Sequence, residues 1–299
     1  DRAVRCMGWG EDGIVLVPSD AEFRMDTSQL DVIIPTLRAS GRHPIAVVGS
    51  ACTTSTGSFD NLLAIYKVAA RYGLWFHVDG AHGAALRLDP NHRHLLAGLE
   101  YADSIVLDFH KMMMAPGLTT GIFFRQGANA YRTFHQKADY LLTFDSGEED
   151  WFNFGRRTFE CTKNMMSLRV FSLLSCYGEQ LFRDYLAQVN TTAARCAELV
   201  TADVDLELAV RPDTNIVCFR YHPRGQGLDA SALDELNALI RGHLVRETNF
   251  YIVQTKLREQ TFLRCTFTNP LTEVKHVEQM LGEVKLTGTR LINLRQLVG

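Results

Sequence analysis

The stretch WFHVDGAHGA, residues 75–84, decides how the fold is interpreted, because an apolar run ends there in an aspartate. Asp79 closes the run, and the small residues Gly80 and Ala81 follow at once. A buried carboxylate is costly unless a cation meets it. The stretch therefore predicts a strand that ends at a site where Asp79 has a cationic partner.

Strands and helices are expected to alternate on both sides of this stretch. The spacing of apolar residues, the capping residue Asp26 or Thr27, and the glycines Gly41 and Gly73 set the helix limits. Strands are expected at 13–18, 45–51, 74–79, 104–109 and 121–125, and helices at 26–40, 58–73 and 92–102. Such alternation predicts an α/β unit with a parallel sheet covered on both faces.

The second half of the chain predicts a smaller unit. A helical stretch near 158–200 leads into it, strands are expected at 215–222, 250–254 and 261–267, and helices at about 229–247 and 271–284. Strands with helices on one face indicate a small α+β domain. We therefore divide the chain into a large domain at 1–155, a connecting helical region at 156–204 and a small C-terminal domain at 205–299.

Composition excludes several classes of protein. The 299 residues are 46% hydrophobic with a net charge of −3, and basic residues are spread along the chain, which argues against nucleic-acid or membrane-surface binding. No apolar run is long enough for a membrane span. The seven cysteines show no metal or disulfide spacing, and His92 and His94 are too close in sequence to share a helical face, so no metal site is expected. We interpret the chain as cytoplasmic, with reduced thiols.

Polar side chains follow three neighbouring strands where each one ends. Hydroxyl residues at 53–58 follow the strand at 45–51, Asp79 follows the next strand, and His110 and Lys111 follow the strand at 104–109. Open parallel sheets bind ligands beyond the carboxyl ends of their strands. These groups are therefore expected at one crevice.

An aspartate and a lysine at one crevice suit pyridoxal 5′-phosphate (PLP). An aspartate keeps the pyridine nitrogen of PLP protonated, and a lysine carries the cofactor as a Schiff base. Alone, Asp79 would be read as a helix or loop cap and Lys111 as a surface lysine. Together, with hydroxyl groups one strand away, they predict a PLP site.

At these residues the sequence resembles the group II PLP-dependent decarboxylases, which include the glutamate, cysteine sulfinate and aromatic amino acid decarboxylases. The resemblance implies a fold-type I, aspartate aminotransferase-like large domain, incomplete at its N-terminus, plus the small α+β domain. It rests on the stretches TTSTGSFDNL (53–62), WFHVDGAHGA (75–84), HRHLLAGLEYADSIVLDFHK (92–111), DSGEEDWFNFGRR (145–157) and FLRCTFTNP (262–270).

The resemblance also implies roles for single residues. Lys111 would form the Schiff base, Asp79 would pair with the ring nitrogen, and Arg264 would bind the substrate α-carboxylate, although an ordinary strand arginine is an alternative. Ala81 would pack on the ring, His110 would lie by the phosphate, and Thr54 would sit near the cofactor. His82 is placed where it could touch substrate, and a surface or capping histidine is as good an explanation.

The resemblance implies decarboxylation of an L-amino acid to its amine and CO₂ by a lyase of amino acid metabolism. Family members are homodimers with active sites at the subunit interface. They also carry an N-terminal phosphate loop and a histidine that stacks on the ring. Because this chain has neither, and because DRAVRCMGWG (1–10) resembles the end of a helix, we expect a second polypeptide or a missing segment to supply them.

Three departures from the family keep alternatives open. The loop near 139–150 is short and lacks the tyrosine that returns a proton after CO₂ leaves, since Tyr140 matches an earlier position. The outcome could instead be transamination, oxidative deamination or carbon–carbon lysis, and the chain alone could be a noncatalytic subunit. Asp108 stands where several members have asparagine, and His82 replaces an aromatic or small residue. Arg156 and Arg157 match the family's GRR, but could cap carbonyls or pair with acidic residues at 148–150.

Overall fold

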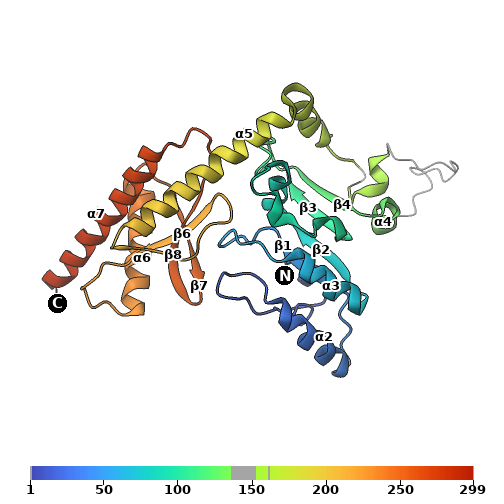
Figure 1. Cartoon of the computed structure of the whole chain (residues 1–299), viewed down its shortest axis with the longest axis horizontal. Coiled ribbons are helices and arrows are strands. Elements are labelled where there is room, and N and C mark those ends of the chain that lie inside the picture. The colour runs from blue at the N-terminus through green and yellow to red at the C-terminus, as the bar shows by residue number, and fades with distance from the viewer. Residues whose placement is uncertain (1, 136–152, 161, 299) are drawn as a thin grey trace.

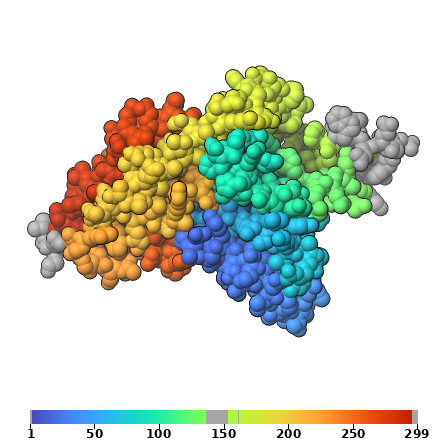
Figure 2. All heavy atoms as spheres, viewed as in Figure 1, coloured from blue at the N-terminus to red at the C-terminus, as the bar shows by residue number. Residues whose placement is uncertain are grey.

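The fold contains two four-stranded sheets in the part of the chain that the structure describes. The computed structural model describes residues 2–135, 153–160 and 162–298, of which 295–298 are described by their backbone alone. Figure 1 shows the two sheets in separate parts of the molecule, with the long helix α5 (Ser167–Ala202) running from one part to the other. In the space-filling view the two parts pack against each other (Figure 2).

The first sheet has the strand order β1-β2-β3-β4. Its strands are β1 (Ala46–Ser50), β2 (Trp75–Asp79), β3 (Ser104–Asp108) and β4 (Thr120–Phe124). The first three are parallel, as predicted, and β4 is antiparallel to β3. The prediction of an all-parallel sheet was wrong at β4 because the connection 109–119 is short and has no crossover helix, whereas a parallel return needs one.

Helix α3 (Leu62–Tyr72) covers one face of this sheet and buries Leu62, Ile65 and Val68. The Asn61 side chain accepts a hydrogen bond from the amide of Ala64 and so begins the helix, which is later than the predicted start at 58. Gly73 ends it with φ of 64°, a left-handed conformation that glycine adopts without strain. The predicted helix 26–40 is confirmed as η1 (Thr27–Gln29) and α2 (Leu30–Ala39), with Asp26 as its N-cap.

The opposite face of the first sheet is open within the described residues. Val48 is 49% exposed and Ile122 is 45% exposed on this face. The strand registers place the side chains of Val48, Trp75, Val106 and Ile122 on this side, which we call the open face. The prediction that both faces would be covered was therefore wrong for these residues.

Two further predicted elements differ from the structure. Residues 13–18 form no strand, because no described strand lies beside them to complete a hydrogen-bond ladder; Leu16 is 86% exposed. Residues 92–102 form two short 3₁₀ helices, η3 (Arg93–Leu96) and η4 (Leu99–Tyr101), in place of one helix. Gly98 separates them with φ of 101°. Between β2 and η3 lies another, η2 (Gly83–Leu88).

The second sheet is antiparallel and has the order β5-β6-β8-β7. Three of its strands were predicted, and β5 was missed because it is only three residues long. The strands are β5 (Leu206–Leu208), β6 (Ile216–Tyr221), β7 (Val253–Leu257) and β8 (Gln260–Thr266). The predicted helices are confirmed as α6 (Ala230–Glu247) and α7 (Val274–Val298), the latter extending well past residue 284.

Each face of the second sheet belongs to a different core. Ile216, Cys218 and Phe262 join the core of the first sheet. Val217, Phe219 and Leu263 face the core formed with α5, α6 and α7. The two parts therefore share an apolar boundary. The domain limits near residues 155 and 204 stay predictions.

The remaining described elements are short. They are α1 (Arg2–Cys6), α4 (Gly127–Thr133) and η5 (Phe154–Arg157). Among the helices of the described residues, none combines the length and the apolar character needed to cross a membrane.

Candidate active site

The site lies at the carboxyl ends of β1, β2 and β3, where backbone hydrogen bonds hold the three following loops together. The Ala51 amide donates to the carbonyl of Asp79 at 2.7 Å, and the Asp108 amide donates to the carbonyl of Ala81 at 3.0 Å. Ser50 pairs with Asp79 in the strand register. Three adjacent strand ends therefore come together where the sequence predicts the ligand site.

Asp79 is exposed at the end of β2. One carboxylate oxygen, Oδ1, accepts a hydrogen bond from the Ala81 amide at 3.1 Å. Among the described residues, no cationic side chain lies within ion-pair distance of Asp79. A cationic group of a ligand could therefore meet this carboxylate without displacing a protein partner.

Lys111 follows β3 and pairs with Asp108. The Lys111 Nζ lies 2.8 Å from Asp108 Oδ2, and the Thr120 hydroxyl donates to Asp108 Oδ1 at 2.6 Å. Partial burial works against ionisation of Asp108, but the hydrogen bonds from Lys111 and Thr120 outweigh it and lower the pKa of this carboxyl. Asp108 therefore turns toward Lys111 and acts as its counter-ion. This is the aspartate that stands where several family members have asparagine.

His110 is fixed by the backbone of the next strand. The Thr119 amide donates to His110 Nδ1 at 3.1 Å. The same nitrogen also lies 3.1 Å from the Thr119 carbonyl, and the other ring nitrogen, Nε2, lies 3.8 Å from Asp108 Oδ2. Lys111, His110 and Asp108 thus form one polar group at the end of β3.

A loop after β1 connects the first sheet to the second. The Ser55 carbonyl accepts hydrogen bonds from Arg264 Nε at 3.0 Å and from the Cys218 thiol at 3.1 Å. No described residue accepts a hydrogen bond from the two terminal nitrogens of Arg264, so this half-buried guanidinium keeps its fork free. Thr54, beside Ser55, is exposed.

His82 reaches the second sheet from the turn after β2. Its Nε2 lies 2.7 Å from Asn215 Oδ1. Burial lowers the pKa of His82; the hydrogen bond to Asn215 opposes this, while the positive charges of Lys111 and Arg264 lower the pKa further. His82 directly follows Ala81, whose amide contacts Asp79 and whose carbonyl contacts the Asp108 amide, so it lies beside the same strand ends.

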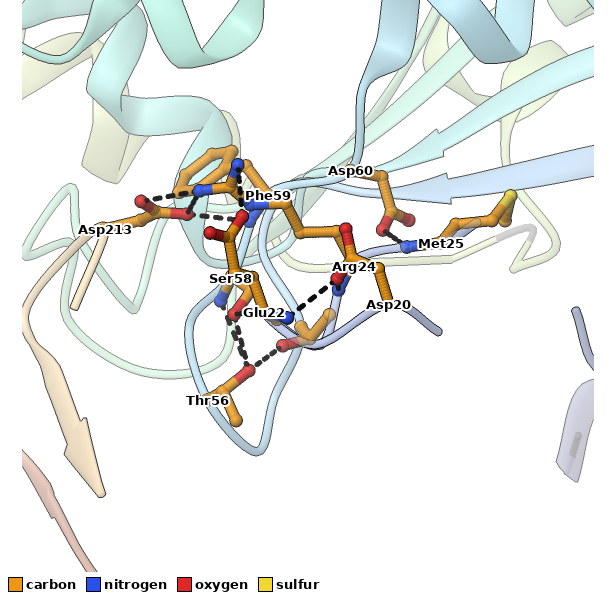
Figure 3. Close-up of polar contacts among 10 residues, drawn as sticks. Asp20, Glu22, Arg24, Met25, Thr56, Ser58, Phe59, Asp60 and Asp213 are labelled. Carbon is orange, nitrogen blue, oxygen red and sulfur yellow. Dashed lines mark hydrogen bonds and ion pairs between the residues drawn. The ribbon is translucent and has the colours of Figure 1, made fainter. Parts of the chain in front are cut away.

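A polar cluster next to the site fixes the loop after β1 (Figure 3). Asp213 accepts from Arg24 at 3.0 Å and from the Phe59 amide at 3.3 Å. Asp60 accepts from the amides of Met25 and Ser50 at 2.6 Å and 2.7 Å. Burial raises the pKa of Asp60, and these two hydrogen bonds oppose the rise. The cluster anchors both ends of the loop that carries Thr54 and Ser55.

Sequence reasoning found most of the ionisable groups and missed Asn215. This residue precedes β6 in an apolar run and is fully buried. The only signal in the sequence was an amide residue next to an apolar strand. Arg157 of η5 stacks on Tyr131 with 5.4 Å between guanidinium carbon and ring centre. The acidic residues 148–150 and the predicted short loop near 139–150 lie outside the described residues.

The residue types present fit PLP. The site offers an amine at Lys111, a carboxylate without a cationic partner at Asp79, and a free guanidinium fork at Arg264. Gly80 supplies close packing, since a Cβ there would lie 2.6 Å from the Ala84 Cβ. The individual roles predicted for these residues stay predictions.

Comparison with known proteins agrees with this chemistry. Residues 4–222 match the family model described as the pyridoxal-dependent decarboxylase conserved domain. The L-2,4-diaminobutyrate decarboxylase of Acinetobacter baumannii is 30% identical over 95% of the chain and 55% of its own length. The aspartate 1-decarboxylase of Aliivibrio fischeri is 29% identical over 94% of the chain and 54% of its own length.

A solved structure extends the agreement to the fold. The crystal structure of mouse CSAD matches with a TM-score of 0.88 and 26% identity, covering 96% of this chain and 61% of that one. The predicted fold-type I architecture is confirmed. The chain therefore spans between about half and three fifths of the length of these proteins.

Proposed function

Since the chain belongs to the pyridoxal-dependent decarboxylase family, we propose that it supplies the catalytic part of an enzyme that converts an L-amino acid to its amine and CO₂. The observation that supports this most directly is the pairing of residue types at two neighbouring strand ends. Lys111 and Asp108 form an ion pair after β3, and Asp79 stands without a cationic partner after β2. Bound PLP would supply an electron sink for the bond that breaks.

Each proposed role uses a contact of the chain. Asp79, oriented by the Ala81 amide, would hold a proton on the ring nitrogen of the cofactor. Lys111 would bond covalently to it after losing a proton, and Asp108, 2.8 Å away, is the nearest carboxylate to stabilise the ammonium form. The terminal nitrogens of Arg264 would bind the substrate α-carboxylate in bidentate fashion.

The other predicted site residues have supporting positions. Ala81 is half-buried between β2 and β3 and would pack against the ring. His110, next to Lys111 at the end of β3, would contact the phosphate. Thr54 is exposed on the loop after β1, where it would lie near the cofactor. His82 would contact the substrate side chain.

The relatives suggest candidate substrates. The two bacterial relatives are named for 2,4-diaminobutyrate and for aspartate, which differ in the charge of the side chain. We propose that this protein acts on an amino acid of similar size. Both amino acids are suitable probes.

We also propose that the working enzyme is a cytoplasmic homodimer completed by another segment or a second polypeptide. The open face of the first sheet supports this, since Val48 and Ile122 are about half exposed there. Sheets with parallel strands normally have both faces covered. Such a segment would also bring the phosphate-binding loop and stacking histidine of the family.

The lysine assignment can be tested by chemical trapping. The protein in its full-length form is incubated with PLP, reduced with borohydride and mapped by peptide mass analysis. We expect the cofactor on Lys111, and CO₂ release from at least one probe amino acid. Lys111→Ala should abolish both, whereas Lys163→Ala, which removes an exposed lysine paired with Glu160, should abolish neither. Cofactor on a different lysine would contradict the proposal.

A further inference from the structure

The link between His82 and Asn215 joins the turn after β2 to the start of β6, across the boundary between the two parts of the molecule. Asn215 is 0% exposed, and its side-chain oxygen lies 2.7 Å from His82 Nε2. A fully buried amide thus contacts a half-buried histidine that directly follows Ala81, the residue whose backbone bonds to Asp79 and to Asp108. Burying a polar group without a hydrogen-bond partner costs free energy. The fully buried Asn215 side chain is therefore held in the orientation that satisfies its hydrogen bonds.

Hydrogen bonds on the other side of Asn215 fix its orientation. Its Nδ2 donates to the carbonyl of Phe267 at 2.7 Å, and its Oδ1 also accepts from the Thr214 hydroxyl at 3.1 Å. The oxygen of the amide therefore faces the histidine. Because an oxygen can only accept, His82 must donate from Nε2, and the neutral ring then carries a lone pair on Nδ1.

The second ring nitrogen is available to a ligand. His82 Nδ1 makes no hydrogen bond to any described residue, and it is not a fully buried atom. Burial and the charges of Lys111 and Arg264 lower the pKa of this histidine, which favours the neutral ring. In the neutral ring Nδ1 is therefore a free hydrogen-bond acceptor on the turn that follows Ala81.

A neutral acceptor distinguishes between substrate side chains. It can accept from an ammonium, hydroxyl or indole group, whereas a carboxylate or sulfinate would face the lone pair and find no donor. Protonating the ring to suit an acidic side chain would be opposed by burial and by two nearby cations. Asn215 sustains this choice by holding the proton on Nε2.

We propose that Asn215 is a positioning residue that fixes the tautomer of His82, and that His82 Nδ1 selects substrates whose side chain ends in a hydrogen-bond donor. This inference rests on the proposed function and narrows its substrate class. It assigns 2,4-diaminobutyrate, rather than aspartate, as the better of the two probes. The two compounds place nitrogen and oxygen at the same distance from the α-carbon.

The tautomer can be measured without any turnover. In the ¹⁵N-labelled full-length protein, two-bond ¹H–¹⁵N correlations should show His82 protonated at Nε2 and bare at Nδ1, with the signal assigned by its loss in His82→Gln. Asn215→Ala should give a mixture of tautomers. A wild-type ring protonated at Nδ1 would overturn the proposal.

Substrate selection is then measured as the ratio of kcat/KM for 2,4-diaminobutyrate to that for aspartate. We expect a ratio above about ten in the wild type, in line with one hydrogen bond to a charged group. His82→Leu, which removes the acceptor, should lower the ratio at least about tenfold, mainly through KM. His82→Gln can still donate to Asn215 and still offers an oxygen acceptor, so it should keep most of the preference.

A matched control is Asn237→Ala. Asn237 lies in α6, is also a fully buried asparagine, and accepts a hydrogen bond from the Tyr221 amide at 2.8 Å. This variant should lower stability and leave the ratio unchanged. If Asn215→Ala does not fold, the two His82 variants still decide the question. A wild type that prefers aspartate, or an unchanged ratio in His82→Leu, would overturn the inference. If the trapping experiment found no cofactor on Lys111, the proposed function would be contradicted. The measured tautomer of His82 would still test whether Asn215 holds the proton on Nε2.

Discussion

At the scale of single residues, the site depends on how each charge is matched. Asp108 has Lys111 as its partner, Asp213 has Arg24, and Asp79 has only an amide. Asp79 is exposed and has no cationic partner among the described residues, so it is open to a protonated ligand nitrogen. The three aspartates therefore have different surroundings although their residue type is the same.

Asp79→Ala should separate cofactor binding from catalysis. Lys111 should still bond to PLP, but CO₂ release should fall at least about a thousandfold, because about 4 kcal/mol of transition-state stabilisation corresponds to three powers of ten. The measurement is CO₂ release by full-length protein at saturating PLP. Asp31→Ala, which removes an exposed partner of Arg71, is the control and should keep normal turnover. Near-normal turnover in the Asp79 variant would exclude its role at the ring nitrogen.

Asp108→Asn should show a pH-dependent loss of stability. The folded pKa of Asp108 is depressed, so its contribution is present above the unfolded value of about 4 and is lost as pH falls through the folded pKa. Because Lys111 is 39% exposed, we expect only about 0.5–1 kcal/mol. Urea unfolding at pH 7 should show this difference between wild type and variant.

The same comparison near pH 3 supplies the internal control. Below the unfolded pKa of about 4 the unfolded chain takes up the proton first, so the difference between the two proteins should be smaller there than at pH 7. A difference that stays constant between the two pH values would mean that shape, rather than charge, explains the effect of the substitution.

The sequence predicted which groups follow the strand ends but not those that depend on packing between the two parts, and the roles of the predicted residues stay predictions. Lys111 and Asp79 could be found because each ends an apolar run. Asn215 could not be found from the sequence. Its partner His82 lies in a turn of the other sheet, and no local sequence pattern connects the two residues. The direction of Asp108 was likewise set by Thr120, across the sheet.

At the scale of elements, the strands of the first sheet were predicted well because each is a short apolar run between glycines and polar loops. The predictions were wrong where contacts with a neighbouring element determine the local structure. The run at 13–18 has strand composition but no described strand pairs with it. The run at 92–102 has helical composition, but the chain must pass close to α3 at Gly98, which interrupts it.

Gly98→Ala should test that close approach. Gly98 has φ of 101°, and an added Cβ would lie 2.4 Å from the backbone nitrogen of Leu63, an atom that cannot move aside. We expect a loss of about 3 kcal/mol or more in the free energy of unfolding, from strain and steric overlap together. Urea denaturation measures it.

Gly41→Ala is the matched control for this prediction. Gly41 also has a positive φ, 82°, but nothing lies within 4 Å of the position of its Cβ. This variant should lose only the conformational cost, about 1–2 kcal/mol. Equal losses at both glycines would show that the contact between Gly98 and α3 contributes nothing.

At the scale of the whole molecule, the second sheet acts as one wall of the site. Its face toward the first sheet carries Arg264 and Cys218, which both bond to Ser55, and Asn215 holds His82 from the start of β6. Its other face packs on α5, α6 and α7. The proposed substrate recognition would therefore depend on the fit between the two parts, which the sequence predicted as separate units without showing how they meet.

A charge placed on the open face should affect residues 1–299 alone and the full-length protein differently, because we expect another segment to cover this face in the latter. Val48 is 49% exposed here, so Val48→Glu should leave the thermal stability of the isolated chain nearly unchanged and reduce its self-association in sedimentation. In the full-length protein, where we expect another segment to cover this face, the same substitution would bury a charge and lower Tm by several degrees. Val32→Glu, at an exposed position of α2, is the control and should alter neither property. If Val48→Glu were equally harmless in both forms, the face would be open in the working enzyme, and the proposal of a covering segment would be wrong.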